Sequence, residues 1–202
     1  MWSFEEVSKG DADIYAFNYW YWEGIIPLYY NSTGANNTFK TQTSNMGYTS
    51  YAFNNYSATN PLSYMKFDQI WVHSGHGNVG FMAFRDDDGN WSYIQISDIN
   101  AMTTNQLSSA RAIITTGCYT AETTDSNPVS SSNNIIYAMY AKGAHFALGW
   151  TGSVNTATSV NWIKNFFNKS GEGETIKRSI EHADYWSNCG MKFYFGDTYQ
   201  SL

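Results

Sequence analysis

Cysteine and proline are scarce in this chain. Its 202 residues include only 2 cysteines, Cys118 and Cys189, which are too few for a disulfide framework and too far apart for a zinc or redox Cys-x-x-Cys motif. There are 3 prolines, and no linker rich in proline, glycine or charge divides the chain. We therefore expect two free thiols in a single domain over residues 1–202.

Charge is also scarce, at 14% of residues against roughly 25% in ordinary domains. The 11 basic residues are thinly spread and the net charge is −6, so no basic stripe is available to neutralise a nucleic-acid backbone. No apolar run approaches the length of a membrane span, and residues 1–6 lack the basic and apolar regions of a signal peptide. We expect a soluble protein that binds neither nucleic acid nor membrane.

Apolar residues, at 43%, and aromatic residues, at 18%, supply ample material for a core. Apolar and β-branched runs predict strands, helical spacing predicts helices near Ala35, Ile135, Val160 and Ile176, and residues 58–65 suit a polar connection or a short helix. A hairpin is expected over residues 80–96. Residues 1–23 are expected to form an N-terminal extension or an edge element. The predicted strands are 24–30, 48–53, 67–73, 112–116, 144–150 and 192–195.

Strands separated by helices, with continuous rather than alternating apolar patterns, favour an α/β fold with a mostly parallel sheet covered on both faces. In such sheets the ligand crevice lies beyond the carboxyl ends of the strands. Two turns fall at such ends, Gly75-His76-Gly77 and Gly117-Cys118. The two turns are therefore the candidate site.

These turns contain the residue types that cysteine catalysis requires. An imidazole can take the proton of a thiol, and backbone N–H groups can then stabilise the oxyanion of a tetrahedral intermediate. We expect Cys118 to be the nucleophile and His76 to be the general base and later the acid. The N–H groups of Gly77 and Cys118 are the candidates for the oxyanion hole.

Four segments of the chain together resemble the clan CD cysteine peptidases, which include caspases, legumains, separases, gingipains, clostripain and bacterial CHAT-domain proteases. Residues 70–77 and 112–118 look like the two strand ends that hold the dyad, and residues 142–150 look like the strand that lines the substrate cleft. Residues 194–197 look like the Tyr-Gly-Asp ending of several bacterial members. The resemblance implies a three-layer α/β/α sandwich of caspase type, no cofactor, and cleavage of protein or peptide substrates through an acyl-enzyme.

Four residues are candidates for substrate binding. Trp150 and Thr151 follow the expected cleft strand, with the alternative that Trp150 is a core residue. Thr116 stands two positions before the nucleophile, where metacaspases have an acidic residue, so specificity for basic residues is disfavoured. Glu122 and residues 86–88 would be the remaining sources of negative charge, although charges at a hairpin tip are usually solvated.

The sequence also allows other roles for these residues and for the chain. His73 is expected to pack at a strand end with a hydrogen bond, and it is the back-up base. His145, His182 and Cys189 are expected to be structural or surface residues. The chain could also be an inactive caspase-like binding or scaffold module, or a zymogen in which residues 14–22 cover the cleft or add an edge strand.

Overall fold

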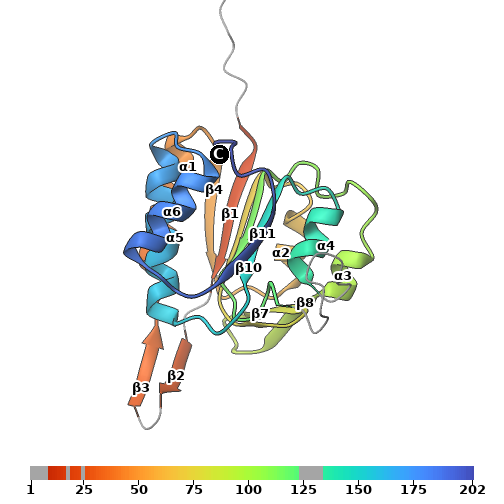
Figure 1. The fold of residues 1–202 in the computed structure, drawn as a ribbon. Coiled ribbons are helices and arrows are strands. Elements are labelled where there is room, and N and C mark those ends of the chain that lie inside the picture. The colour runs from red at the N-terminus through yellow and green to blue at the C-terminus, as the bar shows by residue number, and fades with distance from the viewer. Residues whose placement is uncertain (1–8, 17–18, 24–25, 123–133) are drawn as a thin grey trace, which may run out of the picture.

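The structure is a computed structural model that describes residues 9–16, 19–23, 26–122 and 134–202, with the backbone alone for residues 19–23, 26–30 and 156. Its centre is a six-stranded sheet in the order β11-β10-β9-β5-β1-β4 (Figure 1). Neighbouring strands are parallel, except that β11 runs antiparallel to β10. In chain order these strands are β1 (Asp11–Ala16), β4 (Thr49–Asn54), β5 (Ile70–Ser74), β9 (Ala112–Thr115), β10 (Phe146–Trp150) and β11 (Lys192–Gly196).

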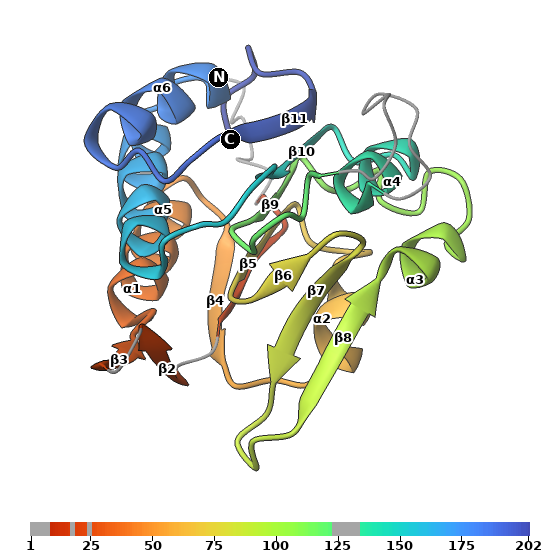
Figure 2. The same ribbon diagram turned by 60° about the horizontal axis from the view of Figure 1, so that its bottom comes forward.

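Helices cover both faces of the sheet, as Figures 1 and 2 show. One face packs against α1 (Thr33–Asn45), α5 (Thr156–Gly171) and α6 (Ile176–Trp186). The other face packs against α3 (Ile96–Asn100), α4 (Ile135–Ala141) and a small antiparallel sheet, with α2 (Thr59–Tyr64) nearby. That small sheet consists of β6 (Gly77–Asn78), β7 (Phe81–Arg85) and β8 (Trp91–Gln95). The predicted three-layer α/β/α sandwich with a mostly parallel sheet is confirmed.

The central strands read as continuous apolar runs because both of their faces are buried. In β5, Ile70 and Val72 belong to the core beneath α1 and α5, while Trp71 belongs to the core on the opposite face. The helices fill the first core with large side chains, such as Trp162 of α5, whose ring meets that of Trp150 edge-on at 5.1 Å. This double burial holds β5 and β9 rigidly at the centre of the sheet.

The N-terminal region is where the structure corrects the prediction. Asp11–Ala16 is not an extension or an edge element, because β1 lies inside the sheet between β4 and β5. Strand β2 (Tyr19–Glu23) instead pairs with β3 (Ile26–Tyr30) in a separate two-stranded sheet. Residues 1–8, and residues 24–25 of the predicted strand 24–30, lie outside the described residues.

The other predicted elements are present with shifts of a few residues at their ends, including the hairpin of β7 and β8 and the short helix α2. Within the described ranges, no helix is long and apolar enough to cross a membrane.

Candidate active site

The candidate site lies beyond the carboxyl ends of β5 and β9, which are adjacent parallel strands (Figure 2). Their register pairs His73 with Thr115. His76 and Cys118 each follow the paired residue by three positions, 76 minus 73 and 118 minus 115. The two predicted catalytic residues therefore leave the sheet at the same edge, on neighbouring turns.

The two turns touch through their glycines. A Cβ atom built on Gly117 would lie 2.9 Å from the Cα and 3.0 Å from the nitrogen of Gly77. One built on Gly77 would lie 3.0 Å from the Cα of Gly117 and 3.1 Å from the carbonyl oxygen of Cys118. Because real Cβ contacts are longer than this, glycine is required at both positions for the backbones to approach so closely.

Cys118 is half-buried, and its sulfur faces the segment that leads into α5. The backbone N–H of Val154 donates to Sγ at 3.2 Å, and the carbonyl oxygen of Val154 lies 3.8 Å from Sγ. The carbonyl can accept the thiol proton, and the N–H can stabilise a thiolate. Both protonation states of the thiol therefore have a partner.

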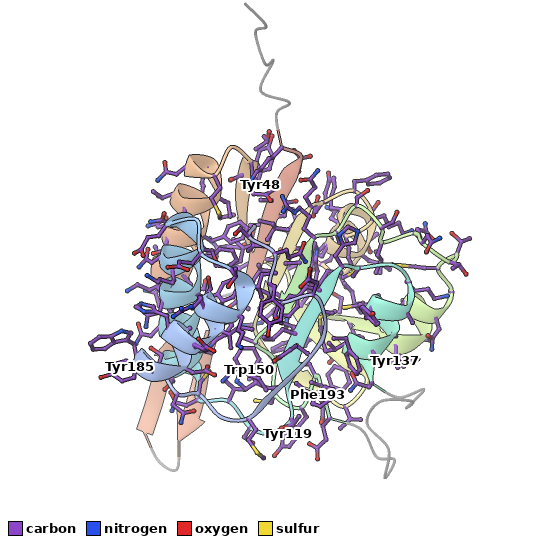
Figure 3. All side chains as sticks on the ribbon, turned by 45° about the horizontal axis from the view of Figure 1, so that its top comes forward. Tyr48, Tyr119, Tyr137, Trp150, Tyr185 and Phe193 are labelled. Atoms are coloured by element: carbon purple, nitrogen blue, oxygen red, sulfur yellow. The ribbon has the colours of Figure 1, made fainter. Side chains whose placement is uncertain are left out.

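The backbone of Tyr119, directly after Cys118, is in the left-handed region with φ of 56°. Its N–H donates to the carbonyl of Gly152 at 3.1 Å, its hydroxyl lies 2.9 Å from Oγ of Ser153, and the N–H of Ala121 donates to Trp150 at 2.9 Å. Figure 3 shows Tyr119 at the lower rim of the molecule, below Trp150. A strained conformation persists where surrounding bonds over-determine it, commonly at functional sites. Sequence reasoning missed Tyr119, because φ is not readable from residue type.

His76 has an exposed side chain, and its ring lies 5.8 Å from that of Trp91 on β8. Its carbonyl accepts a hydrogen bond from the N–H of Ala83 at 2.9 Å, which holds the turn to β7. Loss of water on the covered side of the ring lowers the pKa of His76 below its usual range. The imidazole is therefore neutral at pH 7, the state in which it can accept a proton. Trp91 was also missed, since only the fold brings β8 beside this turn.

His73 is fully buried beneath the site. Its Nε2 lies 2.9 Å from the carbonyl oxygen of Ala83, and its Nδ1 lies 2.9 Å from Oγ1 of Thr115. A carbonyl only accepts, so Nε2 carries the hydrogen and Nδ1 accepts from the threonine. Burial lowers the pKa of His73 to about 4, so the ring is neutral. His73 joins β5, β7 and β9 as expected of a packed strand-end residue, and both of its nitrogens are occupied, which argues against the back-up base.

Two of the four candidate substrate-binding residues lie in the core, which corrects those expectations. Trp150 is fully buried against Trp162, in agreement with the alternative of a core residue. Thr116 is 3% exposed, and its N–H donates to the carbonyl of His73 at 2.9 Å. Thr151 and Glu122 are half-buried near the Cys118 turn, where the N–H of Glu122 bonds Tyr119.

The other residues considered from sequence, which are residues 86–88, His145, His182 and Cys189, lie outside the two turns that carry His76 and Cys118. At the hairpin, Asp86 accepts a hydrogen bond from Asn90, Asp87 accepts one from Asn55, and Asp88 is exposed. His145 is exposed, and His182 is half-buried on α6. Cys189 is buried, and this burial raises the pKa of its thiol to about 11. The two thiols therefore differ sharply in environment.

The fold is caspase-like, and comparison with solved structures shows it directly. The chain is similar to Caspase-1 from Spodoptera frugiperda, with a TM-score of 0.59 and 9% identity over 94% of this chain and 89% of that one. It is also similar to separase in the Saccharomyces cerevisiae separase–securin complex, with a TM-score of 0.52 and 15% identity over 92% of this chain but only 12% of that one. Both are clan CD cysteine peptidases. No protein-family model and no curated protein sequence matches the chain.

Proposed function

We propose that this chain is a cysteine endopeptidase in which Cys118 is the nucleophile and His76 is the general base and acid. The observation that carries the proposal is the equal offset of the two residues beyond the paired strands β5 and β9, on turns that touch at Gly77 and Gly117. A caspase-like fold with this pair at the carboxyl edge of its sheet supports peptidase chemistry over any other for the same residues.

The proposed reaction begins when the neutral His76 ring takes the thiol proton of Cys118. The thiolate attacks the carbonyl carbon of the scissile peptide bond, and the N–H groups of Gly77 and Cys118 stabilise the oxyanion. In the described part of the chain the Cys118 N–H donates to no protein acceptor, which supports this role. His76 then gives its proton to the leaving amine, and water attacks the resulting thioester, returning the thiol and releasing the acid product.

The substrate is proposed to be a protein or peptide chain that reaches Cys118 past Thr151 and Glu122. Position 116, where metacaspases have an acidic residue, is a buried threonine in this chain, which disfavours a basic residue before the scissile bond. The proposed likeness to the bacterial members of clan CD depends on the sequence Tyr194-Phe195-Gly196-Asp197 alone.

Labelling with iodoacetamide and with acyloxymethylketone peptides tests the proposal. Cys118 should react much faster than Cys189, whose raised pKa and burial leave little exposed thiolate. Peptidase activity, read with a positional-scanning peptide library, should be lost in Cys118→Ala and in His76→Ala. Cys189→Ala is the matched control and should retain activity.

The outcome that contradicts the proposal is equally specific. If Cys118 is labelled no faster than Cys189, and if Cys118→Ala leaves any peptidase activity unchanged, the dyad is not catalytic. The chain would then be a caspase-like binding or scaffold module.

A further inference from the structure

A pocket lies away from the proposed dyad, where β1 and β5 begin. It has a volume of about 320 Å³ and opens between β1, β4 and α2, next to the segment that enters β5. Asp68 lies just before β5 and His76 lies just after it, so the length of β5, about 13 Å at ~3.3 Å per residue, separates the pocket from the dyad. The lining residues are Asp11, Asp13, Tyr51, Phe53, Tyr64 and Asp68.

The floor of this pocket is made of two buried carboxyl groups. Asp13 is 3% exposed and Asp68 is 1% exposed. Oδ2 of Asp13 accepts a hydrogen bond from the Tyr15 hydroxyl at 2.8 Å. Oδ1 of Asp13 and Oδ2 of Asp68 accept no hydrogen bond from any other described residue, although the two carboxyl groups bond each other when one of them is protonated. No described lysine or arginine forms an ion pair with either group. Burying ionised carboxylates without a positively charged partner is costly.

The carboxyl pair offsets part of this cost by retaining a proton. Burial, with the charge of the neighbouring carboxyl, raises the pKa of Asp68 to about 9, and burial raises that of Asp13 to about 6. Asp11 is exposed at the pocket mouth and adds a further carboxyl group. A cation that entered the pocket would replace the retained proton and satisfy the unpartnered oxygens.

The rim of the pocket is aromatic. Tyr51 on β4 and Tyr64 at the end of α2 are 46% and 48% exposed, and the ring of Tyr51 lies 6.0 Å from that of Phe53. Exposed ring faces attract organic cations and contact their carbon atoms, in the manner of aromatic cages. A metal ion needs a convergent set of oxygen, nitrogen or sulfur ligands, and no His, Cys, Asp or Glu group of that kind occurs among the described residues. Carboxylates below and rings above therefore favour an organic cation.

We propose that this pocket binds an alkylammonium or guanidinium group, with Asp13 and Asp68 as hydrogen-bond acceptors and Tyr51, Phe53 and Tyr64 around its carbon atoms. The group would displace the proton held between the two carboxyls into solvent. Such a group is carried by a free polyamine or by the basic side chain of a peptide. The site is independent of the peptidase proposal, because none of its residues belongs to the dyad.

Isothermal titration calorimetry on the full chain near neutral pH tests this inference, with spermidine and N-acetyl-argininamide as the two cationic probes and methylurea as a neutral probe. We expect saturable binding of at least one cationic probe and none of methylurea. Tighter binding of spermidine would indicate a free polyamine, and tighter binding of N-acetyl-argininamide a peptide side chain. Asp68→Asn should weaken binding at least about tenfold, because it removes a charged acceptor.

Matched variants separate binding from folding. Tyr64→Ala removes an exposed rim ring and should weaken binding without unfolding the chain, while Asp88→Asn removes an exposed carboxylate elsewhere and should bind as wild type does. Cys118→Ala should also bind normally, whatever its activity. The inference is overturned if neither cationic probe binds saturably, if calcium or magnesium chloride binds instead, or if Asp68→Asn binds as tightly as wild type.

Discussion

Adding one methyl group at Gly117 should separate the two turns that carry His76 and Cys118. The new Cβ would lie 2.9 Å from the Cα of Gly77 and 3.1 Å from Cγ2 of Thr120. The Gly77 contact is with backbone, which has no rotamer to change. The φ of Gly117 is outside the left-handed region, so the substitution acts through this contact and not through backbone strain.

The size of the effect follows from that contact. Ordinary carbon contacts are about 3.5–4.0 Å, so the turns must move apart by roughly 1 Å to accept the methyl group. Forcing an extra methyl group into a packed site costs about 1–3 kcal/mol of unfolding free energy. A misplacement of ~1 Å between reacting groups costs on the order of 100-fold in rate. We therefore expect Gly117→Ala to lose far more activity than its modest loss of stability explains.

Two measurements check this prediction. Urea unfolding gives the stability of the folded chain, and the rate of acyloxymethylketone labelling gives the reactivity of Cys118 in that chain. Gly34→Ala is the control, because its Cβ would meet only the side chain of Lys164 at 3.6 Å on the exposed face of α1. Wild-type labelling by Gly117→Ala, at any stability, would refute the role assigned to the glycine contact.

Three further predictions concern pH and stability. Because loss of water lowers the pKa of His76, the labelling rate of Cys118 should fall only below the usual histidine pKa of about 6.5. A pH–rate profile of labelling measures this fall, and a fall that begins above pH 6.5 would contradict the prediction. Asp68 has a pKa of about 9 in the folded chain and 3.8 in the unfolded chain, so the free energy of unfolding should fall as pH rises between these values. Thermal unfolding across this pH range should show a falling melting temperature, and Asp68→Asn should remove that fall. The side chain of Asn134 caps α4 by accepting from the N–H groups of Ile136 and Tyr137, and it donates to the carbonyl of Ala121. Asn134→Ala should therefore lower the free energy of unfolding in urea by about 1–3 kcal/mol, and an unchanged value would show the cap to be dispensable.

Several expectations from sequence agree with the structure because the relevant signals are local. Strands β5 and β9 are buried on both faces and therefore appear as apolar runs with glycine turns after them. Helices α5 and α6 show apolar residues at helical spacing because each has one buried face. The same logic located the turns of His76 and Cys118 at strand ends.

Other features depend on neighbours that the local pattern does not contain. Strand β1 was missed because Asp11 and Asp13 interrupt its apolar pattern, yet Asp13 is buried beside Asp68, which comes from a distant part of the chain. Trp150 looked like a cleft residue because it ends a strand, but Trp162 covers it. Burial of a single side chain is decided by what packs over it.

The sequence by itself determined the alternation of strands and helices, and it placed a histidine and a cysteine after two of those strands. Only the tertiary structure decided that β5 and β9 are neighbours with His73 opposite Thr115, that Gly77 meets Gly117, and that two carboxyls share one buried pocket. The physical reason is that periodicity and turn signals are properties of adjacent residues. Strand order, register and burial depend on contacts between residues that are far apart in the chain.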